Sequence, residues 1–344
     1  MLLASGIAYR TPMDGHRKEK PQAGERIAKV MARAGLCSRR DAETWIAAGR
    51  VTVNGEKLAS PAFNVKPGDA IAVDEKPLPT RERTRLFRYH KPRGLMTTSR
   101  DPQGRPTLFD RLPKHLPRLV SVGRLDMTSE GLLLLTNDGG LKRALELPET
   151  GWLRRYRVRA NGRATQDDLD RLKNGVTVEG IAYGPVDAKL DRMQGANLWL
   201  TVGMREGKNR EVRKVLSAVG LTVNRLIRVS YGPFQLSELA PGAIEEVNTR
   251  TLRDQVSEKI ARAAGVDFDA PLRLAEPEPE PEKKKIAVRP GRRLSKREGA
   301  AAPARARTPA PPPPPRGKQR GVRGRSPSGR GGGPRGSHFG TKKK

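Results

Sequence analysis

Apolar residues recur at helical spacing near the start of the chain and then alternate at strand spacing. The helical pattern stops at Gly35 and again at Gly49, and Ser38 stands where it can cap the second helix. Asn54-Gly55 separates two short alternating runs, a strong signal for a hairpin. We therefore predict a compact module over residues 25–76. Its expected helices cover 25–34 and 39–48, and its expected strands lie within 51–58 and 65–73.

A second, longer region has mostly strand patterns. Leu132 to Leu135 form an unbroken apolar run that ends at the turn signal Asn137-Asp138-Gly139, which predicts a buried strand. Strands outnumber helices between residues 86 and 256, and short turns join them. This predicts an α+β domain with a mixed, mainly antiparallel sheet. Expected strands are 86–90, 132–136, 156–160, 176–178, 198–202 and 226–229, and expected helices are 141–146, 166–173 and 210–218.

Polar segments flank and join these two regions. Residues 1–24 are expected to be a disordered N-terminal tail and residues 77–85 a charged linker. From residue 257 onward we expect a linker and a disordered tail, because Pro-Glu repeats, a polyproline run and Arg-Gly repeats leave few apolar residues to bury.

Positive charge is present both in the tail and in the body of the chain. The 344 residues carry a formal net charge of +31. From Lys283 onward there are 20 basic residues and one acidic residue, which leaves 48 basic and 36 acidic residues before it. A basic body with a basic tail favours binding of a polyanion, and nucleic acid above all.

Other compositional features narrow the class of protein. A single cysteine, Cys37, excludes an internal disulfide framework and a cysteine-based zinc site. The four histidines have no metal-ligand spacing, so we expect no metal. No apolar stretch approaches the roughly 18 residues that span a bilayer. We expect a cytoplasmic protein with no membrane partner, and a monomer.

The strongest candidate for chemistry is Asp126. It stands beside Arg124 and directly before the Leu-rich strand, so a core strand holds its loop and gives a reactive group a rigid mounting. An isolated aspartate of this kind more often only caps a turn. The long flanking pattern makes the functional interpretation stronger here.

Three further segments carry polar or aromatic groups that a site near Asp126 would need. Alternation places Tyr156 on the inner face of its strand, where its ring could stack on a base or simply fill the core. Arg210 and Arg213 share one side of a helix that Asn209 is expected to cap. An arginine paired with a buried carboxylate would keep it ionised for nucleophilic attack. The apolar strand that contains Leu226 and Ile227 could wall a pocket.

The first module contributes candidate RNA ligands. Arginines at helix starts and beside a hairpin can grip phosphates bidentately, although any one of them more often lies on a solvated face. The expected RNA-binding residues are Arg26, Arg33, Ser38, Arg39, Arg40 and Arg50, together with Lys91, Arg124 and Arg210.

Several motifs together resemble known families. Cys37-Ser-Arg-Arg-Asp-Ala-Glu43 and Ile46-Ala-Ala-Gly-Arg-Val-Thr-Val-Asn-Gly55 resemble an S4 RNA-binding domain. The order of His90-Lys-Pro-Arg-Gly94, Gly123-Arg-Leu-Asp126, Tyr156-Arg-Val158 and Asn209-Arg-Glu-Val-Arg213 resembles ribosomal pseudouridine synthases of the RsuA-like family. Glu206-Gly-Lys-Asn-Arg-Glu-Val-Arg-Lys214 is most similar to the synthase B branch of that family, which modifies the 23S rRNA of the large ribosomal subunit.

The resemblance implies a reaction and roles for its residues. Asp126 would be the nucleophile that detaches uracil from its sugar so that the base rejoins through carbon. Arg213 would pair with Asp126, Tyr156 would stack on the target base, and Arg124 would fill the place that the flipped base leaves. Leu226 or Ile227 would form the apolar wall of the pocket. The isomerisation has no net redox change, so no cofactor is expected.

Two alternatives remain open at this level. The same chemistry could act on small-subunit rRNA or tRNA instead of 23S rRNA or a pre-ribosomal particle. The chain could instead be a non-catalytic RNA-binding ribosome-assembly factor, in which case Asp126→Asn would leave its function intact.

Overall fold

The computed structural model describes residues 24–273. The tails expected over residues 1–24 and from 257 onward therefore lie mostly outside the described residues. Within residues 24–273 no helix has the length and apolar character needed to cross a membrane.

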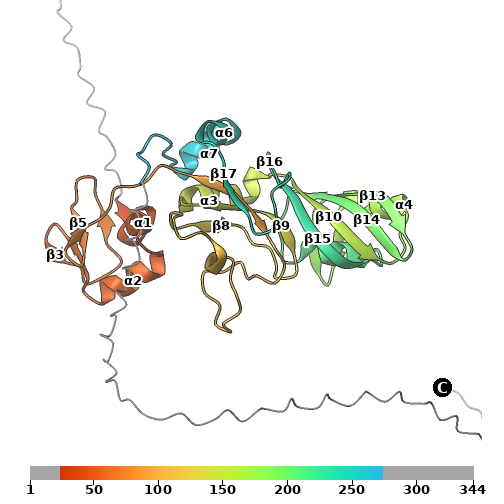
Figure 1. The fold of residues 1–344 in the computed structure, drawn as a ribbon, viewed down its shortest axis with the longest axis horizontal. Helices are drawn as coiled ribbons and strands as arrows, with labels where there is room; N and C mark the ends of the chain where they lie inside the picture. Colours follow the sequence, from red (N-terminus) through yellow and green to blue (C-terminus); the bar gives the residue numbers. More distant parts are fainter. Residues whose placement is uncertain (1–23, 274–344) are drawn as a thin grey trace, which may run out of the picture. The chain divides into compact units, whose positions relative to one another are not determined.

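The first module contains the two expected helices packed on a small sheet (Figure 1). Ser38 caps the second helix through a capping box, in which its side chain accepts from Asp41 N and the Asp41 side chain accepts from Ser38 N. Asn54 and Gly55 both have positive φ angles, 53° and 85°, as a tight hairpin requires. The helices are α1 (Ile27–Arg33) and α2 (Arg39–Ala47), and the sheet has the order β3-β2-β5-β6, made of β3 (Glu56–Lys57), β2 (Val51–Val53), β5 (Ile71–Val73) and β6 (Lys76–Pro77).

The first helix begins later than its pattern indicates. Glu25–Arg26 forms strand β1, which pairs with β4 (Asn64–Val65). The chain passes so close to this partner that a Cβ atom at Gly24 would lie 2.5 Å from the carbonyl oxygen of Val65. Pairing with a distant segment thus overrides helical spacing at this end.

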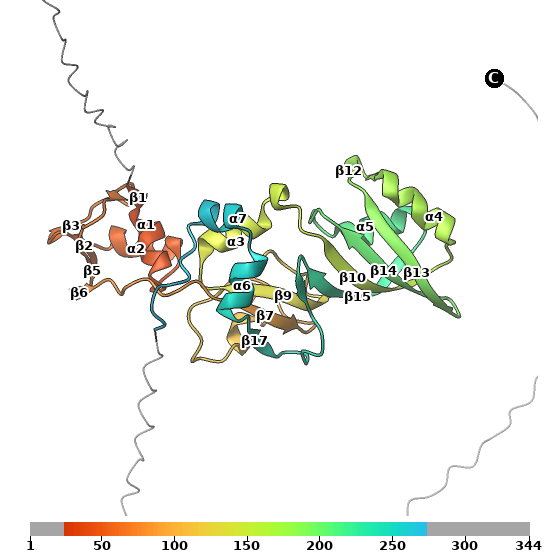
Figure 2. The same cartoon turned by 90° about the horizontal axis from the view of Figure 1, so that it is seen from above.

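A nine-stranded sheet forms the larger domain, with strand order β13-β14-β10-β15-β9-β7-β17 and with β8 and β16 paired to β9 and β15 (Figures 1 and 2). Only the β15–β9 pairing in this sheet is parallel. The expected α+β fold with a mixed, mainly antiparallel sheet is confirmed. The strands are β7 (Leu86–Lys91), β8 (Val120–Val122), β9 (Glu130–Thr136), β10 (Arg154–Asn161), β13 (Val186–Gln194), β14 (Asn197–Met204), β15 (Thr222–Tyr231), β16 (Phe234–Gln235) and β17 (Ile244–Glu246).

Helices and a hairpin complete this domain. The expected helix over 166–173 divides into an α-helix and a following 3₁₀ turn (Arg171–Asn174), with Thr165 as its cap and Gly175 after its end. The helices are α3 (Gly139–Glu146), α4 (Gln166–Asp170), α5 (Glu211–Ala218), α6 (Thr249–Gln255) and α7 (Glu258–Ala264), and the hairpin is β11 (Val176–Val178) with β12 (Ile181–Tyr183).

The two faces of the sheet belong to different hydrophobic clusters. Tyr156, Val158 and Ala160 of β10 pack with residues of α4 and α5. Leu132 and Leu134 of β9 pack on the other side with residues of α3, α6 and α7. Because alternate residues of a strand point to opposite faces, the register of β10 decides which side chains can reach α5.

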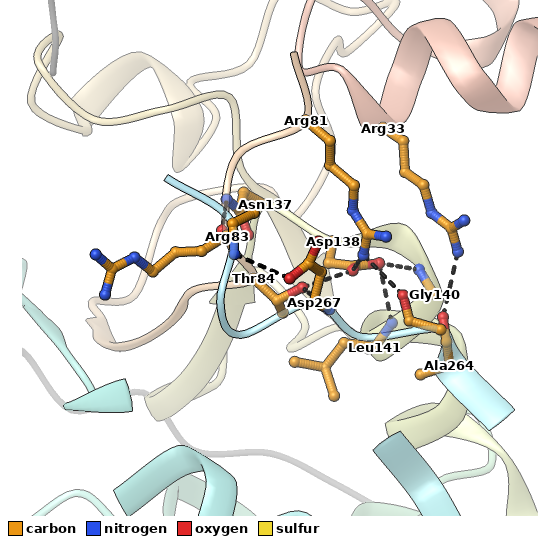
Figure 3. A network of polar contacts seen from close by, with 12 residues as sticks. Arg33, Arg81, Arg83, Thr84, Asn137, Asp138, Gly140, Leu141, Ala264 and Asp267 are labelled. Carbon is orange, nitrogen blue, oxygen red and sulfur yellow. Dashed lines mark hydrogen bonds and ion pairs between the residues drawn. The ribbon is translucent and has the colours of Figure 1, made fainter. Parts of the chain in front are cut away.

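Asp138 is the centre of a buried network that ties the linker to this domain (Figure 3). Its Oδ1 atom accepts from the backbone N–H groups of Gly140 and Leu141, at 2.6 and 3.3 Å, and so caps α3. Its Oδ2 atom accepts from the Thr84 hydroxyl at 2.8 Å and from Arg81 Nη2 at 2.7 Å.

The end of helix α7 joins the same network. Thr84 N donates to the carbonyl of Asp267 at 2.6 Å, and Phe268 packs against the cluster that α3 and α6 form. The segment that follows residue 256, which we expected to be linker, thus contains a helix that packs against α3. Its apolar residues Ile260, Ala261 and Val266 are few and close together, which explains why the sequence pattern did not predict it.

Candidate active site

Asp126 lies in the loop between β8 and β9, and core contacts and hydrogen bonds fix the backbone of this loop. The neighbouring Leu125 is 6% exposed and packs in the core, and its carbonyl accepts from the Thr97 hydroxyl at 2.7 Å. On the other side, the N–H of Gly94 donates to the carbonyl of Met127 at 2.8 Å. The backbone around Asp126 is therefore fixed, while its side chain is 37% exposed. Such a carboxylate can meet a substrate without a rearrangement of its loop.

Lys91 provides a further anchor for this loop. Its side chain is fully buried, and Nζ donates to the carbonyl oxygens of Pro92, Asp126 and Ser129, each at 3.1 Å. Burial lowers the pKa of Lys91 to about 8, although the charges of Asp126 and Glu130 oppose this shift. The expectation that Lys91 binds RNA was wrong, because a fully buried ammonium group cannot reach a phosphate.

Helix α5 brings two arginines to the Asp126 loop. Arg210 Nη1 lies 3.5 Å from Asp126 Oδ2. Arg213 instead donates to the carbonyl of Val223 at 2.7 Å and to the Thr128 hydroxyl at 3.3 Å. The expected ion pair between Arg213 and Asp126 is thus replaced by an ion pair between Arg210 and Asp126. Arg213 binds the same loop two residues further along, at Thr128. Burial and the nearby charge of Arg210 lower the pKa of Arg213.

The start of α5 differs from the sequence prediction and explains the position of Arg210. The cap residue is Arg210, with φ 51° and no side-chain cap, and not Asn209. The left-handed conformation of Arg210 turns the chain just before the buried Glu211, whose Oε2 accepts from Lys208 N at 2.9 Å. Burial raises the pKa of Glu211. Sequence spacing could not reveal this turn, because non-glycine residues seldom adopt positive φ.

Tyr156 and Leu226 lie on the face of the sheet that α5 covers. Both belong to the same buried cluster, with exposures of 8% and 6%. Ile227 packs on the opposite face, against the cluster of α3 and α6. Of the two candidates for the pocket wall, Leu226 is therefore the one that lies on the same face of the sheet as Tyr156.

The other predicted RNA ligands differ in how free their side chains are. Arg124, two residues before Asp126, is exposed. Arg39 and Arg40, which lie on α2, are exposed as well. Arg50 is engaged by Asp74, with Nε 2.8 Å from Oδ1, and Arg33 by Glu25 at 3.0 Å. The remaining two are also used within the module: Arg26 donates to the carbonyl of Ala62, and the Ser38 hydroxyl caps α2.

Some supporting residues had no sequence signal. Thr97 lies in a segment without hydrophobic periodicity, yet it clamps the residue before Asp126. Glu130, at the start of β9, pairs with Arg225 at 2.8 Å, and this hydrogen bond lowers the pKa of Glu130. The second carboxylate near the loop is thereby engaged, and Asp126 is the one that faces outward.

Comparisons with known proteins agree with this division of the chain. Residues 25–71 match the S4 domain, and residues 85–218 match the RNA pseudouridylate synthase family. An uncharacterized RNA pseudouridine synthase of Rickettsia felis is 45% identical over 228 residues, which cover 66% of this chain and 99% of the relative. The chain belongs to the RNA pseudouridine synthase family.

Other relatives of this pseudouridine synthase have more specific names. Ribosomal large subunit pseudouridine synthase B of Pseudomonas aeruginosa is 44% identical over 249 residues, which cover 69% of this chain and 63% of that protein. The protein of the same name from Salmonella typhi is 42% identical over 63% of this chain and 77% of its own length. The chain is also similar to a crystal structure of a pseudouridylate synthase, with 26% sequence identity and a TM-score of 0.48. The match covers 68% of this chain and the whole of that chain.

Proposed function

We propose that this pseudouridine synthase isomerises a specific uridine in ribosomal RNA, and that its target lies in the 23S rRNA of the large subunit. The observation that carries the chemistry is one half-exposed carboxylate, Asp126, on a loop fixed by buried contacts and within 3.5 Å of Arg210. The relatives named for the large ribosomal subunit support the target. We place the reaction in the cytoplasm, on rRNA or a pre-ribosomal particle, with the enzyme as a monomer.

The residues around Asp126 take these roles in the proposed reaction. Asp126 acts as the nucleophile: a carboxylate oxygen bonds to C1′ of the ribose as the bond from C1′ to uracil N1 breaks. The detached base turns, and the bond from C1′ to Asp126 breaks as C5 of the base bonds to C1′. The proton that leaves C5 balances the one that N1 gains, so the reaction needs no oxidant or reductant. The reacting atoms of a base inside a helix are covered by its neighbours, so the target uridine must first leave its stack to reach Asp126.

Other side chains position the base and the carboxylate. Tyr156 and Leu226 form the flat and apolar side of the base pocket, since both lie on the face of β10 and β15 toward α5. Arg210 pairs with Asp126, and Arg213 holds the loop through Thr128. The exposed Arg124 fills the gap in the stack that the flipped base leaves.

The deciding experiment maps pseudouridines in the rRNA of cells that lack this protein. The cells are complemented with wild type, with Asp126→Asn, or with Asp254→Asn as a matched substitution at an exposed position away from the cleft. We expect one large-subunit uridine to regain modification with wild type and Asp254→Asn but not with Asp126→Asn.

Other outcomes separate the alternatives. A single modified site in small-subunit rRNA or tRNA would keep the chemistry and overturn the large-subunit target. Restoration by Asp126→Asn would overturn the role of Asp126 and favour a non-catalytic ribosome-assembly factor. Purified Asp126→Asn should bind the target RNA as tightly as wild type, because the substitution keeps the size of the side chain.

A further inference from the structure

One face of the catalytic sheet carries a row of exposed arginines. Along β10, the exposed Arg155, Arg157 and Arg159 alternate with the buried Tyr156 and Val158. The buried residues face α5, which carries Arg210 and Arg213 to the active site. The three arginines therefore lie on the opposite side of the sheet from Tyr156 and α5.

Neighbouring strands extend this basic face. In the register, Arg159 lies opposite Trp199 of β14 on one side and opposite Arg225 of β15 on the other. The guanidinium groups of Arg157 and Arg192 lie 4.9 and 5.6 Å from the centre of the Trp199 ring. Stacking on an aromatic ring restricts these long side chains, so part of the entropy cost of binding an anion is already met in the free protein.

The acidic residues described on this face form no ion pair with the row. Asp187 of β13 is exposed and lies across Gly203 from Arg155. Glu130 is engaged by Arg225, and Asp191 accepts from the Thr201 hydroxyl at 2.9 Å. Among residues 24–273, Arg155, Arg157 and Arg159 form no ion pair. Like charges placed opposite each other or at alternate positions of a strand are destabilising. The fold bears this cost at a place that neither the core nor the active site requires.

We propose that this face, made of Arg155, Arg157, Arg159, Arg192 and Trp199, is a second RNA-binding surface. It binds the phosphate backbone of a segment of the substrate RNA outside the active-site cleft. This proposal rests on the proposed function, because it takes an RNA to be the substrate.

The geometry favours a nucleic-acid strand over an acidic protein. Alternate residues of a strand lie about 6.8 Å apart, a spacing of the same order as that between successive phosphates of one RNA strand. Guanidinium groups bind phosphate bidentately. The face also offers little exposed apolar surface, since Ile227 opposite Arg157 is partly buried in the cluster beneath α3 and α6. A protein interface of useful affinity would need such apolar surface at its centre.

The test compares two full-length variants with equal loss of charge. Arg155→Gln/Arg157→Gln/Arg159→Gln removes the row, and Arg171→Gln/Arg250→Gln/Arg262→Gln removes three exposed arginines elsewhere. Each variant is assayed on a minimal stem-loop with the target uridine and on a long rRNA fragment that contains the same stem-loop. Affinity is measured over a range of salt concentrations.

We expect the first variant to raise KM for the long fragment by roughly tenfold and to lower its salt slope by about 3, one unit for each lost phosphate contact. Its kcat, and its KM for the stem-loop, should stay within twofold of wild type. An equal loss of affinity for the long fragment with the control variant would show that the effect depends on net charge alone. That result would overturn the proposal. So would an unchanged or improved affinity, which would result if the acidic segment 276–282 of this chain occupied the face instead of RNA.

Failure of the proposed function would be recognised separately. The same binding titrations are repeated with Asp126→Asn as the parent protein, where no turnover occurs. If wild type modifies no RNA but the row still contributes to binding of the long fragment in this background, the surface stands and the proposed reaction falls. If wild type is active and the row makes no contribution, only the surface is overturned.

Discussion

The ammonium group of Lys91 lies beneath Asp126 and donates a hydrogen bond of 3.1 Å to the backbone carbonyl of Asp126, the residue whose carboxylate pairs with Arg210. The same group also holds the carbonyl of Ser129, so one buried cation spans the loop from Asp126 to its end. The loop position is thus set from the core side, independently of the arginine that meets the carboxylate from α5. Lys91 is accordingly a positioning residue, whose protonation state matters to the reaction.

The lowered pKa of Lys91 predicts opposite pH effects on activity and stability. Above about pH 8 the folded protein loses the Lys91 proton, and with it one of the three hydrogen bonds of Nζ, two of which hold the loop, so kcat should fall. Between pH 8 and 10.5 the unfolded chain holds more protons at this residue than the folded chain does, so the free energy of unfolding gains a contribution that rises with pH. Single-turnover rates and chemical unfolding over this pH range check both effects.

Lys91→Met is the control for this assignment. The substitution leaves three carbonyl oxygens without their donor and should lower stability by about 3 kcal/mol at pH 7, with a lower kcat. Both pH effects should then be smaller than in wild type. An alkaline fall in kcat that persists unchanged in Lys91→Met would assign it to another group.

Arg210 and Arg213 should have separable effects. Arg210 is exposed and contacts only the carboxylate, so Arg210→Gln should change stability by no more than about 0.5 kcal/mol but lower kcat roughly tenfold, or about 1.4 kcal/mol of barrier. Arg213→Gln removes the donor to the Val223 carbonyl and Thr128 and should cost about 1–3 kcal/mol of stability as well as activity. Thermal unfolding and single-turnover assays on both variants give the comparison. Equal losses of stability would contradict this division.

Asp138 should be among the most sensitive positions for stability. Its carboxylate accepts four hydrogen bonds at 3% exposure, including one from Arg81 (Figure 3). Asp138→Ala leaves the cap of α3 and the Thr84 hydroxyl without an acceptor, and we expect a loss of about 3–5 kcal/mol in the free energy of unfolding. Asp138→Asn keeps an oxygen for the cap and should cost less. Asp254→Ala, at an exposed position on α6, should stay within about 0.5 kcal/mol of wild type.

Removal of the basic tail should weaken RNA binding without loss of the catalytic step. Residues 274–344 contain 20 basic and five acidic residues. A truncation after Arg273 keeps Phe268 in its cluster and the 2.7 Å hydrogen bond from Arg273 to the carbonyl of Thr80. Affinity should fall most at low salt, and the salt slope should become shallower, because fewer counterions are released. An unchanged salt slope in RNA titrations of the truncated protein would refute this.

Local sequence signals predicted most of the secondary structure. Ser38, Asn54-Gly55, Thr165 and Gly175 act at the positions where short-range rules expect caps, turns and stops. The predictions failed where a distant segment competes with local preference. Examples are Glu25–Arg26, which pairs with β4, and helix α7, whose few apolar residues matter only because α3 lies beside them.

What the sequence by itself determined was the type of most elements, the order of the domains and the presence of one carboxylate ahead of a buried strand. These follow from periodicity, capping and turn chemistry, which act between residues close in the chain. Only the tertiary structure decided that Arg210 meets Asp126, that Lys91 is buried beneath it, and that Leu226 rather than Ile227 shares the face of Tyr156. Each of these depends on strand register, on a left-handed residue, or on contacts between residues far apart in the chain, where a shift of one position turns a side chain to the other face.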